Sequence, residues 1–249
     1  MTDQSLQFPR FYVTAPSPCP YLEGKEERKV FTELTGDDSE QLYEALSRVG
    51  FRRSQSVAYR PACEGCNACI SVRVVADEFS PTRTMRRIER VNKDLVSVAI
   101  DPWVTQEQFD LLKRYLSQRH ADGGMATMDI YEYAEMVENS PVTTRIIEYR
   151  ETSRDPTSTR PGRLIAAALT DLMSDGLSMI YSFFDPATDR RSLGTYVILD
   201  HIRRTAEAGL QHVYLGYWIA NSAKMAYKTR FRPLERLGPE GWYRFDPDK

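Results

Sequence analysis

The C-terminal third of the chain constrains the fold most, because apolar runs alternate there with turn signals. Residues 164–172 and 179–184 have the composition of buried strands, and Ser174-Asp175-Gly176 between them has the composition of a turn. The segments that follow predict a helix at 192–208 ended by Gly209, a strand at 212–218 and a short helix at 223–228. Two paired strands followed by a helix, a strand and a helix are typical of an α+β unit.

The N-terminal part contains shorter elements. Asp38 and Gly50 have the residue types that begin and end a helix, Ser80-Pro81 predicts another helix start, and Thr105-Gln106-Glu107-Gln108 has the form of a capping box. We further expect extended chain at 51–60, strands at 70–75 and 96–100, a helix at 131–138 and a surface loop at 154–162. We therefore predict an α+β protein with a small N-terminal domain at 1–95 and a larger domain at 96–249.

Composition excludes several classes of protein. The net charge of −2 rules out a uniformly basic nucleic-acid coat, so any RNA must bind to a local patch. There is no stretch of about 18 apolar residues and no signal-peptide pattern, from which we expect a cytoplasmic protein with no membrane contact. Neither a P-loop nor a dinucleotide-binding glycine motif is present, so ATP and NAD use are not indicated, and nothing indicates DNA binding.

Cysteines gather in one short loop. Cys63, Cys66 and Cys69 form a C-x2-C-x2-C run, in which Gly65 permits the bend that turns thiolates toward one ion. With Cys19 as a fourth ligand, the loop predicts a zinc or iron–sulfur site. The alternative is a set of reduced cysteines packed in the loop, because the fourth Cys-Pro of a ferredoxin run is missing.

A second feature is a basic stripe. Between Arg83 and Lys93 only Glu89 is acidic, and the basic residues recur at three- and four-residue steps, as one helical face requires. This stripe suits an RNA backbone, although a solvated helix face is the alternative. Its members are Arg83, Arg86, Arg87, Arg90 and Lys93.

Several motifs together resemble the aminoacyl-tRNA–protein transferase family. The N-terminal motifs are Gly50-Phe51-Arg52-Arg53-Ser54-Gln55, Tyr59-Arg60-Pro61-Ala62-Cys63 and Cys66-Asn67-Ala68-Cys69-Ile70-Ser71-Val72-Arg73. The C-terminal motifs are Ser182-Phe183-Phe184-Asp185-Pro186, Ser192-Leu193-Gly194-Thr195-Tyr196, Tyr214-Leu215-Gly216-Tyr217-Trp218 and Lys224-Met225-Ala226-Tyr227-Lys228. The compact length is similar to the bacterial aspartate/glutamate leucyltransferase branch.

The resemblance implies both a fold and an activity. It implies an N-terminal cysteine-bearing domain, a C-terminal domain of N-acetyltransferase-like (GNAT) fold, and transfer of leucine from Leu-tRNA to proteins with N-terminal Asp or Glu. Such transfer marks proteins for degradation by the N-degron route. The chemistry is aminolysis of an ester, which positioning and oxyanion stabilisation can accelerate without a strong base or a cofactor. The eukaryotic relatives spread their metal-binding cysteines differently from this chain.

We expect particular residues at the site. Arg52, Arg53, Arg60 and Arg73 flank the cysteine loop and suit the acceptor carboxylate, while Arg190, Arg191 and Ser192 at a helix start suit the tRNA end. The matched motifs add Tyr59, Lys224 and Lys228 as substrate-binding residues. For catalysis we expect Tyr214 or Tyr217 to orient the amine or the ribose, and Asp171 or Asp185 to position a proton acceptor.

Two other functions stay open from the sequence. An acyl-CoA-dependent N-acetyltransferase would fit the C-terminal pattern, although Arg190-Arg191-Ser192-Leu193-Gly194 is a poor copy of a glycine-rich coenzyme A loop. A non-catalytic zinc module that binds RNA would fit the cysteines and the basic stripe, but it gives the C-terminal unit no role.

Overall fold

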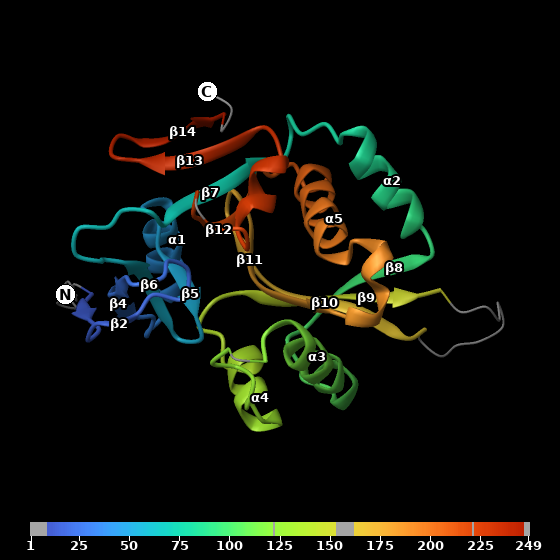
Figure 1. Ribbon diagram of the computed structural model, residues 1–249, viewed down its shortest axis with the longest axis horizontal. Helices are drawn as coiled ribbons and strands as arrows, with labels where there is room; N and C mark the ends of the chain where they lie inside the picture. Colours follow the sequence, from blue (N-terminus) through green and yellow to red (C-terminus); the bar gives the residue numbers. More distant parts are fainter. Residues whose placement is uncertain (1–8, 122, 153–161, 221, 247–249) are drawn as a thin grey trace, which may run out of the picture.

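One mixed sheet organises the molecule (Figure 1). The computed structural model describes residues 9–121, 123–152, 162–220 and 222–246. In order across the sheet, the strands are β14 (Gly241–Phe245), β13 (Leu234–Gly238), β7 (Ile70–Val75), β12 (His212–Trp218), β11 (Gly176–Phe184), β10 (Leu164–Met173), β9 (Thr144–Glu151) and β8 (Leu95–Ile100).

Neighbouring strands in this sheet are antiparallel except for β11 and β12, which run parallel. A parallel pair needs a crossover connection, and helix α5 (Leu193–Glu207) supplies it. Strand β10 is buried along almost its whole length, as expected for an apolar strand covered on both faces.

Helices cover the two faces of the sheet. In Figure 1, α3 (Gln106–Arg119) and α4 (Ile130–Glu138) lie on one side of β9 and β10, and α5 and α2 (Arg83–Val91) lie on the other. On the first side, Leu112 and Tyr133 pack against Leu169. On the second, Ile198 and Ile202 of α5 share a core with residues of α2, β7 and β12.

The N-terminal elements form a smaller layer beside β11 and β12. Four of its strands form a sheet in the order β1 (Tyr12–Val13), β4 (Lys29–Glu33), β6 (Val57–Pro61) and β5 (Arg52–Ser54). Strands β2 (Ser17–Pro18) and β3 (Glu26–Glu27) form a separate pair. Helix α1 (Ser39–Arg48) ends before Gly50, whose φ is +90°. Tyr43 and Leu46 of α1 share a core with Met173 of β10 and Tyr214 of β12, so this layer packs directly on the main sheet.

The predicted domain boundary at residue 95 is wrong. Strand β7 precedes that boundary but lies between β12 and β13 in the middle of the main sheet, and α2 packs against α5. Hydrogen bonding between strands therefore joins residues 70–75 to the C-terminal part of the chain. The predicted α+β character is confirmed by the mixed sheet and its helices.

Most predicted elements are present, with local differences. Thr82, rather than Ser80, caps α2, because its hydroxyl oxygen accepts a hydrogen bond from the backbone N–H of Met85. The capping box at Thr105 and Gln108 is confirmed. Strand β9 and the hairpin β13–β14 were not predicted, and the loop predicted at 154–162 lies, except for Gly162, outside the described residues. No described helix has the length and apolar composition needed to cross a membrane.

Candidate active site at a fork between two strands

Strands β11 and β12 pair only at their beginnings. Residues Gly176, Leu177 and Ser178 pair with His212, Val213 and Tyr214, after which both strands continue without pairing to each other. We call this divergence the strand fork. Main-chain N–H and C=O groups that point into the fork have no neighbouring strand to pair with. They need other hydrogen-bond partners, because an unpaired buried amide or carbonyl costs free energy.

Arg52 of β5 bridges the two strands at the fork. Its Nη2 donates to the carbonyl of Met179 in β11 at 2.7 Å, and its guanidinium lies on Gly216 of β12. A Cβ on Gly216 would lie 1.4 Å from Arg52 Nη1, and Gly216 has a φ of +77°. Only glycine permits this backbone conformation and this approach together. The Gly216 of the sequence motif is thus explained by the arginine packed on it.

Lys228 occupies the β12 side of the fork. Its Nζ donates to the carbonyls of Leu215 at 2.8 Å and Tyr217 at 2.5 Å, and the residue is only 6% exposed. Burial lowers the pKa of the Lys228 ammonium to about 7, and the nearby charge of Arg52 adds to this effect. The side chains of Arg52 and Lys228 thus donate to main-chain carbonyls where the two strands diverge.

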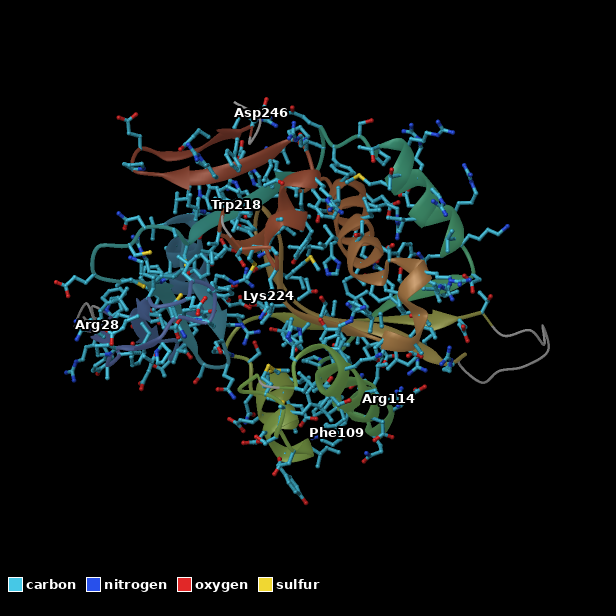
Figure 2. The ribbon with its side chains drawn as sticks, in the orientation of Figure 1. Arg28, Phe109, Arg114, Trp218, Lys224 and Asp246 are labelled. Atoms are coloured by element: carbon cyan, nitrogen blue, oxygen red, sulfur yellow. The ribbon has the colours of Figure 1, made fainter. Side chains whose placement is uncertain are left out.

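Aromatic and basic residues gather around the fork. Burial raises the pKa of the Tyr227 phenol, while the charge of Arg52 opposes this shift and Tyr115 of α3 adds to it. The ring centroids of Tyr115 and His120 lie 5.5 Å apart with their planes tilted by 58°, and the pKa of His120 is lowered by burial and by the charges of Lys224 and Arg119. Figure 2 places Lys224 near the centre of the view, above α3. The end of α3 thus lies within electrostatic range of Lys224 and Tyr227, in the segment that leads to Lys228 at the fork.

The charge of this region determines what it can bind. Arg52 brings a positive charge to the fork, and Lys228, whose pKa is lowered to about 7, carries a partial one. The exposed Lys224 precedes Lys228 in the chain, and Arg60 of β6 adds its charge near Tyr217. Carboxylates and phosphates are the ligands that such a group attracts, with arginine preferred where two oxygens are bound together. The fork is therefore suited to an anionic substrate.

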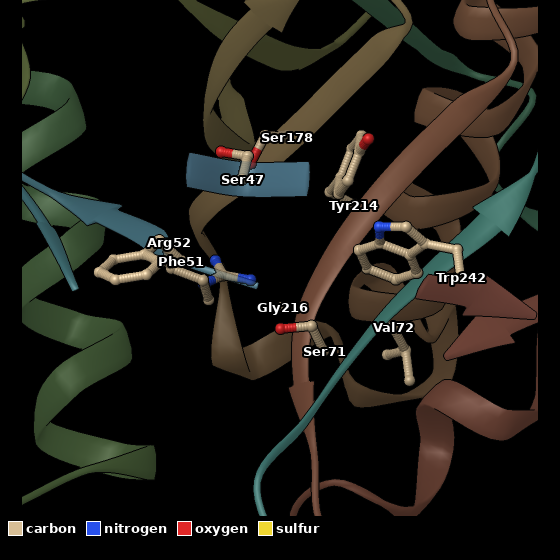
Figure 3. A pocket seen from close by; sticks show the side chains of 9 residues that line it. All are labelled: Ser47, Phe51, Arg52, Ser71, Val72, Ser178, Tyr214, Gly216 and Trp242. Atoms are coloured by element: carbon tan, nitrogen blue, oxygen red, sulfur yellow. The ribbon is translucent and has the colours of Figure 1, made fainter. Parts of the chain in front are cut away.

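Two hollows in the described part of the structure are not suited to a substrate. A cavity of about 10 Å³ adjoins the fork and has room for about one water molecule (Figure 3). A second hollow, of about 340 Å³, lies where Gln55 faces α4, and Glu132 and Glu135 line it. Those carboxylates disfavour an anionic ligand, so we place neither substrate end there.

Tyr214 and Tyr217 were expected to be catalytic, but both hydroxyls have internal partners. Tyr214 donates to Asp175 Oδ2 at 2.8 Å and accepts from Arg73 Nη1 at 3.0 Å. Arg73 also pairs with Glu235, at 2.9 Å. Tyr217 is hydrogen-bonded to the carbonyls of Gly50 at 3.0 Å and Tyr59 at 3.1 Å. These contacts give both tyrosines and Arg73 structural roles, in place of the catalytic and substrate-binding roles expected from the sequence.

The expected roles of Arg53 and Asp171 also need correction. The two side chains form an ion pair, with Nη2 and Oδ1 2.6 Å apart and both side chains 0% exposed. Thr144 donates to the same carboxylate at 2.8 Å. Neither group can contact a substrate from this position, so the pair instead joins β5 to β10. Asp185 is similarly buried and pairs with Arg163 at 2.8 Å.

The basic residues before α5 lie apart from the cysteine loop, beside α2. Arg191 donates to Asn92 at 2.9 Å and forms an ion pair with Asp94, whereas Arg190 is exposed. Ser192 begins α5 with a φ of +52° and makes no side-chain cap. Arg190 is thus available to an anion, and Arg191 holds the turn after α2.

The sequence matches two family models in the order of the chain. The model for the C terminus of arginine-tRNA-protein transferase covers residues 107–238, and the model for the N terminus covers residues 17–87. The chain belongs to the arginine-tRNA-protein transferase family. The fork lies inside these matches, because Arg52 falls in the N-terminal match and β11, β12 and Lys228 in the C-terminal one.

Individual relatives in this transferase family are similar over nearly the whole chain. The aspartate/glutamate leucyltransferase of Sphingopyxis alaskensis is 59% identical over 97% of this chain and 93% of its own length. That of Rhizorhabdus wittichii is 58% identical over 99% of this chain and 91% of its own. A solved structure of L-PGS from Bacillus licheniformis aligns with 80% of this chain and 58% of that one, at 11% identity and a TM-score of 0.43.

The four cysteines of this transferase lie near one another. All are half-buried and free, and burial together with the other three cysteines raises the pKa of Cys69 to about 11. Cys63 Sγ accepts a hydrogen bond from the backbone N–H of Arg28, with the two heavy atoms 3.5 Å apart. Within the described part of the chain, no three cysteine, histidine or acidic side chains converge as a metal-ligand set. Among the described residues, the cysteines thus do not have the closed geometry of a structural zinc site.

Sequence patterns missed part of the site of this transferase. Tyr115 and His120 are separated from Lys224 by about a hundred residues, and only the tertiary fold brings them within electrostatic range of this segment. No local signal distinguishes Tyr115 from the other aromatic residues of α3.

Proposed function

We propose that this protein transfers leucine from Leu-tRNA to the N-terminal α-amine of proteins that begin with Asp or Glu. The observation that supports it most is the similarity, over nearly the whole chain, to relatives that bear the name aspartate/glutamate leucyltransferase. The positive charge at the strand fork agrees with it, since the acceptor side chain and the RNA end are both anionic. Leucine at the N-terminus would mark the acceptor for degradation by the N-degron route.

The topology of β8 to β12 with α5 is compatible with the N-acetyltransferase-like fold that the sequence resemblance implies. We propose this correspondence for the C-terminal part of the sheet, with β7, β13 and β14 as additions on the β12 side. Aminoacyl-tRNA is a cytoplasmic substrate, so the proposal also places the protein in the cytoplasm.

The reaction is aminolysis of the aminoacyl ester. The amine nitrogen bonds to the leucyl carbonyl carbon, the bond from that carbon to the ribose oxygen breaks, and a proton of the amine ends on the ribose hydroxyl. An α-amine with a pKa of about 7.7–8.0 is partly neutral at pH 7, so the protein does not need a strong base. Placing the two ends together and stabilising the oxyanion supply the rate.

We propose distinct tasks for the cations around the fork. Arg52 is held at a defined place by Met179 and Gly216, so its charge can stabilise the developing oxyanion without reorganising. Lys224 and Arg60 are exposed and can contact the acceptor carboxylate, while Tyr59 supports Tyr217 beneath them. Lys228 keeps the β12 backbone in place.

A transfer assay tests the function. The full-length protein is incubated with radiolabelled Leu-tRNA or Arg-tRNA and with peptides that begin with Asp, Glu, Asn or Gln. We expect leucine on the Asp and Glu peptides and at least tenfold less product with the amide peptides or with Arg-tRNA. Preferential transfer of arginine, or acetylation of the same peptides from acetyl-CoA without leucine transfer, would contradict the proposal.

The acceptor contact has its own test. Lys224→Gln should raise the KM for the Asp peptide about tenfold and leave the KM for Leu-tRNA nearly unchanged, because a charge-assisted hydrogen bond contributes about 1.5–3 kcal/mol. Lys25→Gln, which removes an exposed lysine from the N-terminal turn, is the matched control. Equal effects on both KM values would argue against the assignment.

Metal binding at Cys19, Cys63, Cys66 and Cys69 stays a prediction. Protein purified without chelators should contain about one zinc, or one iron–sulfur cluster, per chain if the cysteines rearrange around a metal. Elemental analysis and a thiol titration of the same sample check this. Four titratable thiols per chain and no bound metal would contradict it.

A further inference from the structure

Helix α2 presents a row of arginines to solvent. Arg83, Arg86, Arg87 and Arg90 are all exposed, and with 3.6 residues per turn they fall within an arc of about 100° on the helix. Arg86 donates to the carbonyl of Pro81, and within the described residues none of the four pairs with a carboxylate. We call these four residues the α2 arginine face.

The opposite side of α2 holds the helix in place. Met85 is buried, and Ile88 packs against the core that contains Ile198 of α5. Asn92, fully buried after the helix, donates to the carbonyls of Ile88 and Arg191, at 2.9 Å each. Apart from the hydrogen bond of Arg86 to Pro81, the contacts that fix the helix therefore do not involve its arginines.

Charge at the α2 arginine face is not neutralised from within the helix. Glu89, the one acidic residue of α2, is half-buried and forms no ion pair with an arginine of the helix in the described structure. Elsewhere arginines such as Arg150 and Arg204 are paired with carboxylates. In a chain with a net charge of −2, the face therefore concentrates positive charge locally.

We propose that the α2 arginine face binds phosphates of the tRNA backbone, which rests on the proposed function for the identity of the RNA. The planar guanidinium suits phosphate, and successive arginines along one face match a polyanion that offers a phosphate at every nucleotide. The face makes contacts to backbone only, so it contributes affinity and orientation rather than base recognition.

The position of the face relative to the fork agrees with this occupant. From the fork, β11 continues into η1 (Pro186–Arg191), where Arg190 is exposed, and Arg191 bonds to Asn92 at the end of α2. A tRNA whose aminoacyl end lies at the fork can therefore run past Arg190 onto α2. Figure 2 shows nitrogen-tipped side chains projecting outward along this helix.

An anionic membrane is the other polyanion that a basic helix can meet. A helix lying in a membrane interface turns an apolar face toward the acyl chains. The apolar face of α2, with Met85 and Ile88, is turned toward α5 and is covered. RNA is therefore the partner that fits.

The salt dependence of tRNA binding tests the proposal. The full-length protein and the variant Arg83→Gln/Arg87→Gln are titrated with deacylated tRNA between 50 and 200 mM KCl. Each lost phosphate contact lowers the slope of log K against log salt by about 0.9, so the variant slope should be shallower by about 2. We expect about tenfold weaker binding at 100 mM KCl, and a higher KM for Leu-tRNA with no change in the KM for the acceptor peptide.

The variant Arg28→Gln/Arg114→Gln is the matched control, because it removes two exposed arginines away from α2. It should keep the wild-type slope. An unchanged slope and Kd in the α2 variant would overturn the proposal, as would binding to phosphatidylglycerol vesicles without binding to tRNA. A wild-type protein that binds tRNA with the expected difference in slope, yet transfers no leucine, would support the α2 face while removing the proposed function.

Discussion

Gly216 shows how a single residue position can depend on its neighbour across the fold. Its φ is +77°, and an added Cβ would lie 1.4 Å from Arg52 Nη1, so alanine would both strain the backbone and displace the guanidinium. A non-glycine residue in this conformation costs about 1–2 kcal/mol, and the displaced arginine adds to that loss.

Gly216→Ala should therefore lower both the stability and kcat/KM, the latter at least tenfold, as measured by urea unfolding and the leucine transfer assay. Gly209→Ala is the control, since Gly209 has a φ of +70° but open space around it. The control should lose about 1 kcal/mol of stability and keep its kinetics. Equal kinetic effects for the two variants would show that the contact with Arg52 is unimportant.

His201 is a second position where burial decides the behaviour. Its Nδ1 lies 2.7 Å from the carbonyl of Val197, to which it donates, so Nε2 accepts from Thr170 at 2.8 Å and the ring is neutral. Burial lowers the pKa of His201 from 6.5 to about 4. As the pH falls from 6.5 toward 4, the unfolded chain takes up a proton that the folded chain does not, so stability falls.

The expected loss of unfolding free energy is about 3 kcal/mol. The pKa of His201 is about 2.5 lower in the folded chain than in the unfolded chain, and one pKa unit corresponds to about 1.36 kcal/mol. Urea unfolding of the wild type and His201→Gln between pH 7 and pH 4 measures it. The difference in unfolding free energy between the two proteins should shrink as the pH falls. If the unfolding free energies of the two proteins changed in parallel with pH, the neutral, buried state given to His201 would be wrong.

Between elements, the Arg53–Asp171 ion pair joins the N-terminal layer to the main sheet. Both side chains are 0% exposed, so removal of one charge leaves the other buried without a counterion. Asp171→Asn should destabilise the protein by about 3–5 kcal/mol, whereas Arg53→Met/Asp171→Leu should regain much of that loss. Urea unfolding of both variants decides the matter, and a loss below about 1 kcal/mol in Asp171→Asn would contradict the role given to the pair.

At the scale of the whole molecule, β7 makes the two parts of the chain inseparable. It pairs with β12 through residues 70–75 and with β13 through Val72, Arg73 and Val74. A fragment of residues 96–249 would leave β12 and β13 with exposed edges and remove Val72 and Val74 from the core.

We therefore expect fragment 96–249 to lack a cooperative unfolding transition, as measured by circular dichroism on heating. Fragment 66–249 is the comparison, because it keeps β7 and α2. A cooperative transition in fragment 96–249 at the temperature of the full-length protein would restore the domain boundary that the sequence suggested.

The sequence alone predicted elements whose signals are local. The helix before Gly50, the capping box at Thr105 and the turn at Ser174-Asp175-Gly176 depend on neighbouring residues, and all three are present. The family resemblance came from motifs in order along the chain, which the family matches confirm. Strand β9 was missed because its charged residues, such as Glu148 and Arg150, mask the strand pattern until they pair with each other.

The sequence by itself thus determined the element types, the family and the set of basic and aromatic residues from which a site could be built. Only the tertiary structure decided their roles, because Arg52 and Arg53 are adjacent in the chain and project to opposite faces of one strand. One reaches the fork between β11 and β12, and the other is buried against Asp171. Burial and pairing depend on contacts between distant segments, and no local pattern contains them.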